Sequence, residues 1–242
     1  MNGLVGMLGS GMPETYELKV LLQYIQDVSL KYQRAISVPE ELAWLVDQLS
    51  MALDILDLAL GKDVDISNEF SVPHSLFNYW DAVASAREVY NTRSTAFSGR
   101  VQEYSYMTVY HHVTRWLAEL DKGIQRANLI GTSNSNLDDN NLGIPATYFS
   151  FNVTKWVLNG GKDSDGQYLV NATEMAVNKF PLFLEGPVRS MKTYNQHDAK
   201  QIYDRVKESG LYDKELGMYT LSARYANVHY LFKLSLSLRT SF

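Results

Sequence analysis

The sequence predicts a mainly α-helical protein built from antiparallel helix hairpins, with a short aromatic β-hairpin inserted late in the chain. Two observations predict this fold class. Apolar residues recur at helical spacing in four long segments between about residues 14 and 127. After residue 143 aromatic and β-branched residues dominate, as is typical of strands. The four helices must bury their broad apolar stripes against one another, as in helical bundles or α/α toroids.

Sequence signals mark where the long helices begin or end. The first helix is expected over residues 14–36, with Ile36 as its last apolar position. The second follows Ser37-Val-Pro39-Glu40, a capping-box pattern with proline in the first turn, and stops at Gly61. The third is expected from Ser71-Val-Pro73 to about Tyr90, and the fourth from about Tyr104 to Ala127.

The remaining elements are shorter. Residues 128–143 are polar and predict a loop. A β insertion is expected over about 144–190, in which a strand over 144–153 is joined by a turn at 159–166 to a partner over 167–170. One further helix is expected over about 198–209. These elements form one region over residues 1–223, and residues 224–242 form a divergent tail.

Composition excludes several functional classes. The chain of 242 residues has 22 Lys and Arg against 27 Asp and Glu, a net charge of −5, so it lacks the basic character of proteins that bind nucleic acid or anionic membranes. It has no cysteine, which excludes disulfides and thiolate sites. No apolar stretch approaches the roughly 18 residues of a membrane span, and no signal-peptide pattern is present. We therefore expect a cytoplasmic protein.

Two motifs resemble metal sites and are better explained otherwise. Asp163-x-Asp165-Gly166 begins like a calcium loop but lacks the later ligands, so a polar hairpin turn is the favoured interpretation. His111 and His112 are adjacent on a helix and point about 100° apart, so they cannot share one metal ion. We interpret them as a structural pair, and no metal site is predicted.

The segment 180–192 contains a carboxylate in an apolar run, followed by two cations. Burying Glu185 without a partner would cost several kcal/mol, so it should meet Arg189, Lys192 or a ligand hydroxyl. Two interpretations stay open. One is an internal salt bridge that fixes a loop, and the other is a pocket wall that presents an acceptor and donors to a polyhydroxylated ligand.

Four blocks of sequence, in the same order, resemble the long bacterial cellobiose-phosphorylase-like proteins, which are inverting glycoside phosphorylases. The resemblance covers most of residues 1–220 as scattered blocks. These blocks are Asn2-Gly-Leu with Leu8-Gly-Ser-Gly-Met-Pro-Glu14-Thr-Tyr-Glu17-Leu, then Ile144-Pro-Ala-Thr-Tyr-Phe149, Phe183-Leu-Glu-Gly-Pro-Val188 and Leu211-Tyr-Asp-Lys-Glu-Leu-Gly-Met-Tyr219.

The resemblance implies a fold and a reaction. The fold would be part of an (α/α)6 barrel. In the reaction, inorganic phosphate attacks the anomeric carbon of a β-glucoside while a carboxylic acid protonates the leaving oxygen, which gives an α-sugar 1-phosphate. No cofactor is implied, and inorganic phosphate is a co-substrate.

The resemblance also implies that no residue of this chain is the general acid. In the family that acid is an aspartate in a Trp-x-Asp-x-Met-Asn stretch, and Met1-Asn2 resembles its end. The chain would then be an internal piece of a larger enzyme, inactive on its own. Residues 224–242 depart from the family pattern.

Six residues are the candidates for a sugar site, with an oligosaccharide or β-glucan as ligand. Asn2 and Gly3 would line its floor, Tyr148 would stack on a sugar face, and three wall residues would hydrogen-bond hydroxyls: Glu185, Arg189 and Lys192. Expected protein partners are the rest of the barrel or a second copy of the chain. The alternative functions are a non-catalytic carbohydrate-binding module, a helical interaction module and a helical scaffold without a ligand.

Overall fold

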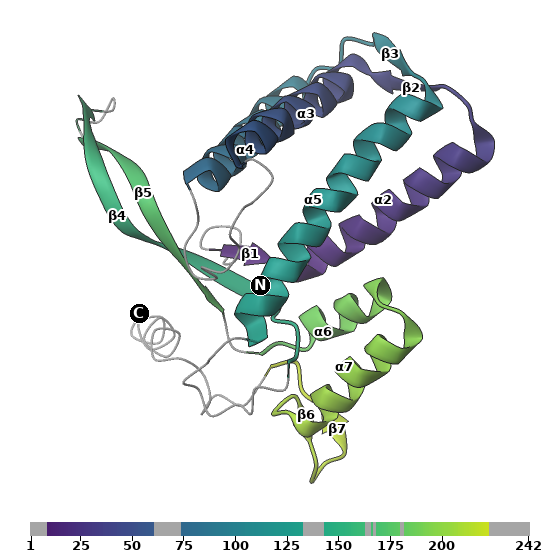
Figure 1. Cartoon of the computed structure of the whole chain (residues 1–242), viewed down its shortest axis with the longest axis vertical. Coiled ribbons are helices and arrows are strands. Elements are labelled where there is room, and N and C mark those ends of the chain that lie inside the picture. Colours follow the sequence, from purple (N-terminus) through teal and green to yellow (C-terminus); the bar gives the residue numbers. More distant parts are fainter. Residues whose placement is uncertain are drawn as a thin grey trace. The chain divides into compact units, whose positions relative to one another are not determined.

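The computed structural model describes residues 9–60, 74–132, 143–162, 166, 168–179 and 182–222 (Figure 1). This part of the chain is mainly helical with small antiparallel sheets, which confirms the predicted class. The chain divides into two compact units, each described by itself below. Unit 1 comprises Met1–Leu21, Glu119–Asn152 and Val177–Phe242, and unit 2 comprises Leu22–Ala118 and Val153–Ala176.

The described part of the chain contains four long helices, three shorter helical segments and seven strands. The helices are α2 (Met12–Tyr32), α3 (Glu40–Leu60), α4 (His74–Arg93), α5 (Tyr106–Thr132), α6 (Glu185–Ser190), the 3-10 turn η1 (Met191–Thr193) and α7 (Gln196–Glu208). The strands are β1 (Gly9–Gly11), β2 (Ile36–Pro39), β3 (Val101–Tyr104), β4 (Tyr148–Lys162), β5 (Tyr168–Lys179), β6 (Tyr212–Asp213) and β7 (Met218–Tyr219). They form the sheets β1-β4-β5, β2-β3 and β6-β7.

The boundary between the first two helices differs from the prediction. Helix α2 ends at Tyr32, and Gln33 adopts a left-handed conformation with φ 51°, which does not continue a helix. Residues 36–39 then form β2, which pairs with β3 over 101–104. The expected cap and first-turn proline at Ser37 and Pro39 are therefore strand residues, because pairing with a distant segment outweighs the local capping pattern.

Later boundaries also shift. Helix α5 continues to Thr132, so the first five residues of the expected loop are helical. Strand β4 runs through 159–162, which had been expected to turn. The end of the expected β insertion is wrong as well, because 185–190 form helix α6. The loop residues 133–142, the helix start at 71–73, the turn residues 163–165 and the tail 224–242 lie outside the described residues.

Unit 2 packs α3 against α4 and joins α3 to α5 through side chains. The Ser50 hydroxyl lies 3.0 Å from Nδ1 of His112, whose ring stacks on Trp116 with centroids 5.9 Å apart. Burial lowers the pKa of His112, which favours the neutral ring, whereas its neighbour His111 is exposed. Buried apolar residues include Leu53, Leu56, Val113 and Leu117.

Unit 1 is assembled from segments far apart in the sequence. Strand β1 pairs with β4, with Ser10 opposite Phe149. A separate apolar cluster lies beneath α7 and consists of Ile144, Ile202, Val206 and Leu211. The Tyr16 side chain is fully buried, and its hydroxyl has no hydrogen-bond partner in the described part of the chain.

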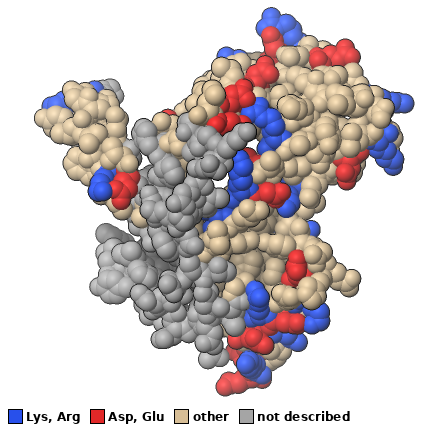
Figure 2. Space-filling view, viewed as in Figure 1, with Lys and Arg blue, Asp and Glu red and all other residues tan. Residues whose placement is uncertain are grey.

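The hairpin of β4 and β5 exposes large apolar side chains. Trp156 is 59% exposed and Tyr168 65%, and few charged residues show on the hairpin in Figure 2. Lys155 and Glu174 form an ion pair across it, which lowers the pKa of Glu174 through its hydrogen bond with the lysine. Of the helices in the described ranges, none combines the length and apolar character needed to cross a membrane.

Candidate functional site

Three of the four segments quoted for the family resemblance meet around Thr147 in unit 1. The Met12 N–H donates to the Thr147 carbonyl oxygen at 2.8 Å. The Thr147 hydroxyl donates to the Phe183 carbonyl oxygen at 2.8 Å and accepts from the Gly186 N–H at 3.0 Å. Thr147 is fully buried. We call these four residues, Met12, Thr147, Phe183 and Gly186, the Thr147 junction.

The residues that follow the C-terminal block of the resemblance reach the same junction. The Leu184 N–H donates to the Leu221 carbonyl oxygen at 3.0 Å, and Phe183 forms a β-bridge with Ser222. The Thr220 N–H donates to the carbonyl oxygen of Leu211 at 2.8 Å, which fixes this segment to the chain just after the end of α7. Backbone hydrogen bonds, together with those of the Thr147 hydroxyl, therefore hold four distant parts of the chain in one place.

The junction positions Tyr148 beside Glu185, two of the predicted site residues. The Tyr148 hydroxyl donates to Glu185 Oε2 at 3.3 Å, and burial, followed by the charge of Glu185, raises the pKa of Tyr148. The Tyr148 ring is only 8% exposed and meets Phe183 edge-on at 5.3 Å between centroids. The group of Tyr148 that faces Glu185 is therefore its hydroxyl. The sequence predicts a different role for this side chain, in which the ring face stacks on a sugar.

Glu185 differs from the prediction in two ways. It lies at the start of α6 and is exposed, so the expected burial is wrong. Its described partner is Tyr148, whereas Arg189 and Lys192 pair with another carboxylate. The helix places Glu185 in its first turn, where the dipole favours a negative charge without a cationic partner. The salt bridge within the segment, one of the two interpretations left open by the sequence, is therefore absent among the described contacts of Glu185.

Arg189 and Lys192 instead converge on Glu17 of α2. Arg189 NH1 lies 2.6 Å and Lys192 Nζ 2.7 Å from Glu17 Oε1, and each side chain is between 39% and 48% exposed. The hydrogen bonds from Lys192 and then Arg189 hold the pKa of Glu17 below its usual value. Glu17 belongs to the first block of the resemblance, but no local pattern revealed this contact.

The ion pairs of Arg189 and Lys192 with Glu17 predict a specific dependence of stability on pH. Folding lowers the pKa of Glu17 below the ordinary value of 4.5. The contribution of Glu17 to the free energy of unfolding is therefore complete above pH 4.5, and it is lost as pH falls through the lowered folded-state pKa. In the Glu17→Gln variant this contribution is absent. We expect the difference in unfolding free energy between wild type and variant to shrink on acidification below pH 4.5.

Urea denaturation over a series of pH values measures this difference. Adding salt at pH 7 should also shrink it, because the three side chains are well exposed and their charges are screened. A difference that grows on acidification would contradict the assigned ion pairs.

Unit 1 also contains a cavity of about 210 Å³ that the sequence did not reveal. Polar side chains from α5 and α7 line it, among them Asn128, Asp198 and Arg205, together with Tyr194. The Asn128 amide donates to the Tyr194 hydroxyl at 2.7 Å. No local sequence pattern indicates this cavity, because the residues that line it come from separate parts of the chain.

The candidate site thus presents an exposed carboxylate at Glu185 and two cations at Arg189 and Lys192. Such groups suit hydrogen bonding to hydroxyls, which both donate and accept. Asn2 and Gly3 lie outside the described residues. Within the described ranges, no three His, Asp or Glu side chains are grouped so that they could hold a metal ion. No protein-family model matches the sequence, and no curated protein matches it either.

Proposed function

We propose that this chain is part of a carbohydrate-active protein of the inverting glycoside phosphorylase kind, and that unit 1 supplies part of a sugar-binding wall. One observation carries the proposal. Three of the four blocks that resemble this family meet at the Thr147 junction, although about 130 residues of chain separate the first block from the second. Segments that share a functional site are expected to converge in this way.

The chemistry of the wall supports the ligand class. Sugar hydroxyls can donate to the Glu185 carboxylate and accept from Arg189 or Lys192, and hydrogen bonds to charged groups contribute about 1.5–3 kcal/mol each. In this proposal the helices of both units belong to a partial (α/α)6 barrel, and a cytoplasmic location and inorganic phosphate as co-substrate follow from the same resemblance. The remainder of the barrel would be the natural protein partner.

Binding of cello- and laminari-oligosaccharides to the whole chain tests the proposal. We expect saturable binding in isothermal titration calorimetry, and about tenfold weaker binding by Glu185→Gln, because the neutral amide replaces a charged acceptor. The control is Glu174→Gln, which makes the same change at a partly exposed carboxylate on the β4–β5 hairpin. Equal affinities of the two variants would contradict the site, and absence of saturable binding by the wild type would contradict the function.

The same samples test turnover. The resemblance assigns the general acid to no residue of this sequence, so we expect binding without release of sugar 1-phosphate when inorganic phosphate is added. Formation of sugar 1-phosphate by the purified chain would contradict this part of the proposal and would place a catalytic acid within the 242 residues.

A helical interaction module is the second candidate. The observation that favours it is the apolar surface of the β4–β5 hairpin, where Trp156, Leu158 and Tyr168 are each more than half exposed. Concentration-dependent self-association in sedimentation, together with no affinity for any of the oligosaccharides, would favour this candidate over the sugar site.

A further inference from the structure

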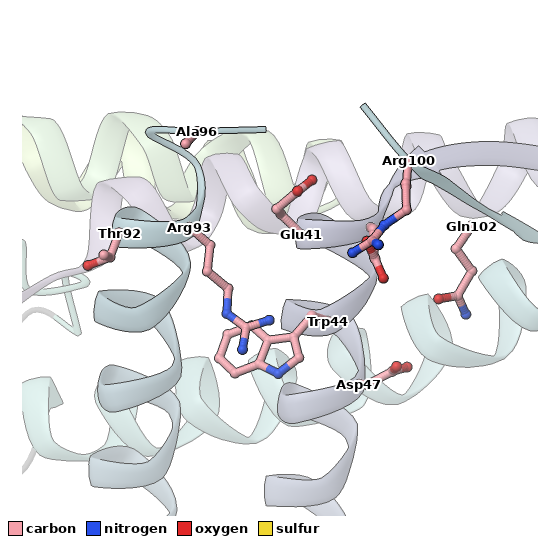
Figure 3. A pocket seen from close by; sticks show the side chains of 9 residues that line it. Glu41, Trp44, Asp47, Thr92, Arg93, Ala96, Arg100 and Gln102 are labelled. Atoms are coloured by element: carbon pink, nitrogen blue, oxygen red, sulfur yellow. The ribbon is translucent and has the colours of Figure 1, made fainter. Parts of the chain in front are cut away.

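A pocket of about 440 Å³ in unit 2 is occupied by contacts among its own side chains (Figure 3). The Arg93 guanidinium lies over the Trp44 ring, 4.1 Å from its centroid, and Arg100 pairs with Glu40. The indole and both guanidinium groups of the pocket are therefore already engaged. A reactive pair of residues lies instead on the β4–β5 hairpin of the same unit.

Asn159 and Gly160 form an Asn-Gly pair near the end of β4. Both residues are exposed. Gly160 adopts φ 80°, a left-handed conformation that suits glycine, and a Cβ atom at this position would meet no described heavy atom within 4 Å. The peptide bond between the two residues is therefore shielded neither by a side chain at position 160 nor by packing from the described part of the chain.

The side-chain amide of Asn159 is polarised by one hydrogen bond and weakly held by another. The Gly161 N–H donates to Asn159 Oδ1 at 3.1 Å, and a donor at this place stabilises negative charge that develops on the oxygen when the amide carbon is attacked. Asn159 Nδ2 lies 3.5 Å from Asn171 Oδ1, which is the long limit of a hydrogen bond. The amide carbon is therefore activated, and its amino group is only weakly retained.

We propose that Asn159 is a site of spontaneous deamidation in the folded protein. The Gly160 backbone nitrogen attacks Asn159 Cγ, so that a bond forms between these two atoms and the Cγ–Nδ2 bond breaks. Ammonia leaves and takes with it the former amide proton of Gly160. The reaction is favoured because both groups belong to one short stretch of chain and glycine leaves the attacking nitrogen unhindered. The immediate product is a five-membered cyclic imide.

Water opens this imide at either of its two carbonyl carbons, and the two products differ in their effect on the hairpin. Opening at Cγ gives aspartate, whose carboxylate can still accept from the Gly161 N–H and from the Asn171 amide once that amide has turned over. Opening at the backbone carbonyl gives isoaspartate, which routes the main chain through the side-chain methylene and lengthens β4 by one atom. Isoaspartate should therefore disturb the end of β4, whereas aspartate should not.

Incubation of the whole chain at pH 8, followed by trypsin digestion and mass spectrometry, tests the inference. Lys155 and Lys162 flank the site, so trypsin releases Asn159 in the peptide 156–162, which contains no other amide side chain. We expect this peptide to gain the mass difference between an amide and a carboxylic acid as incubation proceeds. The other Asn-Gly pair of the sequence, at positions 2 and 3, lies outside the described residues and falls in a different tryptic peptide.

Asn171 is the matched control within the same hairpin. It is exposed on β5, but it is followed by Ala172 rather than by glycine, and trypsin releases it in the peptide 163–179. We expect its deamidation to be at least tenfold slower than that of Asn159. Equal rates at the two asparagines would overturn the inference.

A second comparison separates the folded structure from the sequence alone, because an unfolded chain leaves any Asn-Gly pair open to attack. We expect the rate at Asn159 in the folded protein to stay within threefold of the rate in the chain unfolded by guanidinium chloride. A folded rate more than threefold lower would overturn the inference, since it would show that β4 protects the pair. The Asn159→Asp variant should keep the urea midpoint of the wild type, and a lower midpoint would contradict the accommodation of aspartate described above.

Discussion

Replacing Gly186 with alanine is expected to destabilise unit 1 by about 3 kcal/mol, an upper value for overpacking a closely packed site. A Cβ atom at this position would lie 2.5 Å from the Thr147 hydroxyl oxygen and 2.7 Å from the Thr147 Cα. The Cα belongs to backbone that is hydrogen-bonded to Met12, so it cannot move aside cheaply. The change would also disturb the Gly186 N–H bond to Thr147 and separate α6 from β4.

The matched control is Gly123→Ala in α5. A Cβ there meets no heavy atom within 4 Å, so alanine should raise the free energy of unfolding by about 0.8 kcal/mol through its better helix propensity. Urea denaturation followed by circular dichroism measures both variants. A Gly186→Ala protein as stable as the wild type would refute the close contact, and with it the Thr147 junction.

Replacing Leu211 with alanine is expected to cost about 3 kcal/mol. Its side chain is fully buried in the cluster with Ile144, Ile202 and Val206, and truncation leaves a cavity that these neighbours only partly fill. The matched control is Leu216→Ala on the neighbouring turn, where the side chain is 72% exposed, and its effect should stay within about 0.5 kcal/mol.

The two leucine variants are compared by urea denaturation under the same conditions as the glycine pair. The Leu211→Ala protein should also lose oligosaccharide affinity in proportion to its unfolded fraction, since Leu211 supports the wall without touching a ligand. Equal destabilisation by the two leucine changes would contradict the described packing of α7.

The long helices could be predicted because their apolar periodicity coincides with burial. Val113, Leu117 and Ile124 recur at helical spacing in the segment of the fourth expected helix, and all three are buried in α5. The third helix shows the limit of this reasoning. Trp80 lies on its apolar stripe, yet the indole is 61% exposed in α4. Periodicity identifies a helix more reliably than it identifies which apolar side chains are covered.

The β2–β3 pairing and the addition of β1 to β4 could not be predicted, because the paired segments are distant in the sequence. Ser37 and Pro39 fit a helix start when read locally, and only the pairing of β2 with β3, about 60 residues later, makes them strand residues. Strand β1 is similar, since the glycine-rich Gly9–Gly11 has low strand propensity and is ordered by pairing with β4. A single sequence does not show which segments pair.

The candidate site was predicted in its residue types but not in its pairings. One of the two interpretations of Glu185, Arg189 and Lys192 was a salt bridge within one short segment. Helix α6 and the turn η1 instead direct the two cations toward Glu17, a residue 172 positions earlier in the chain than Arg189, and Glu185 meets Tyr148. The directions of these side chains follow from the helical backbone of 185–190. The sequence analysis had placed this segment in the β insertion, so it could not predict those directions.

The discontinuous make-up of unit 1 has a consequence for the order of folding. Its described residues come from three stretches of chain, and closing Met12 onto Thr147 requires a loop of more than a hundred residues. Such long-range closure is slow relative to the formation of local helices. During synthesis, α3 can pack on α4 before the later elements of unit 1, α6, α7 and β7, have been made. A ribosome stalled near residue 180 would therefore hold a nascent chain with a formed helix pair and no Thr147 junction.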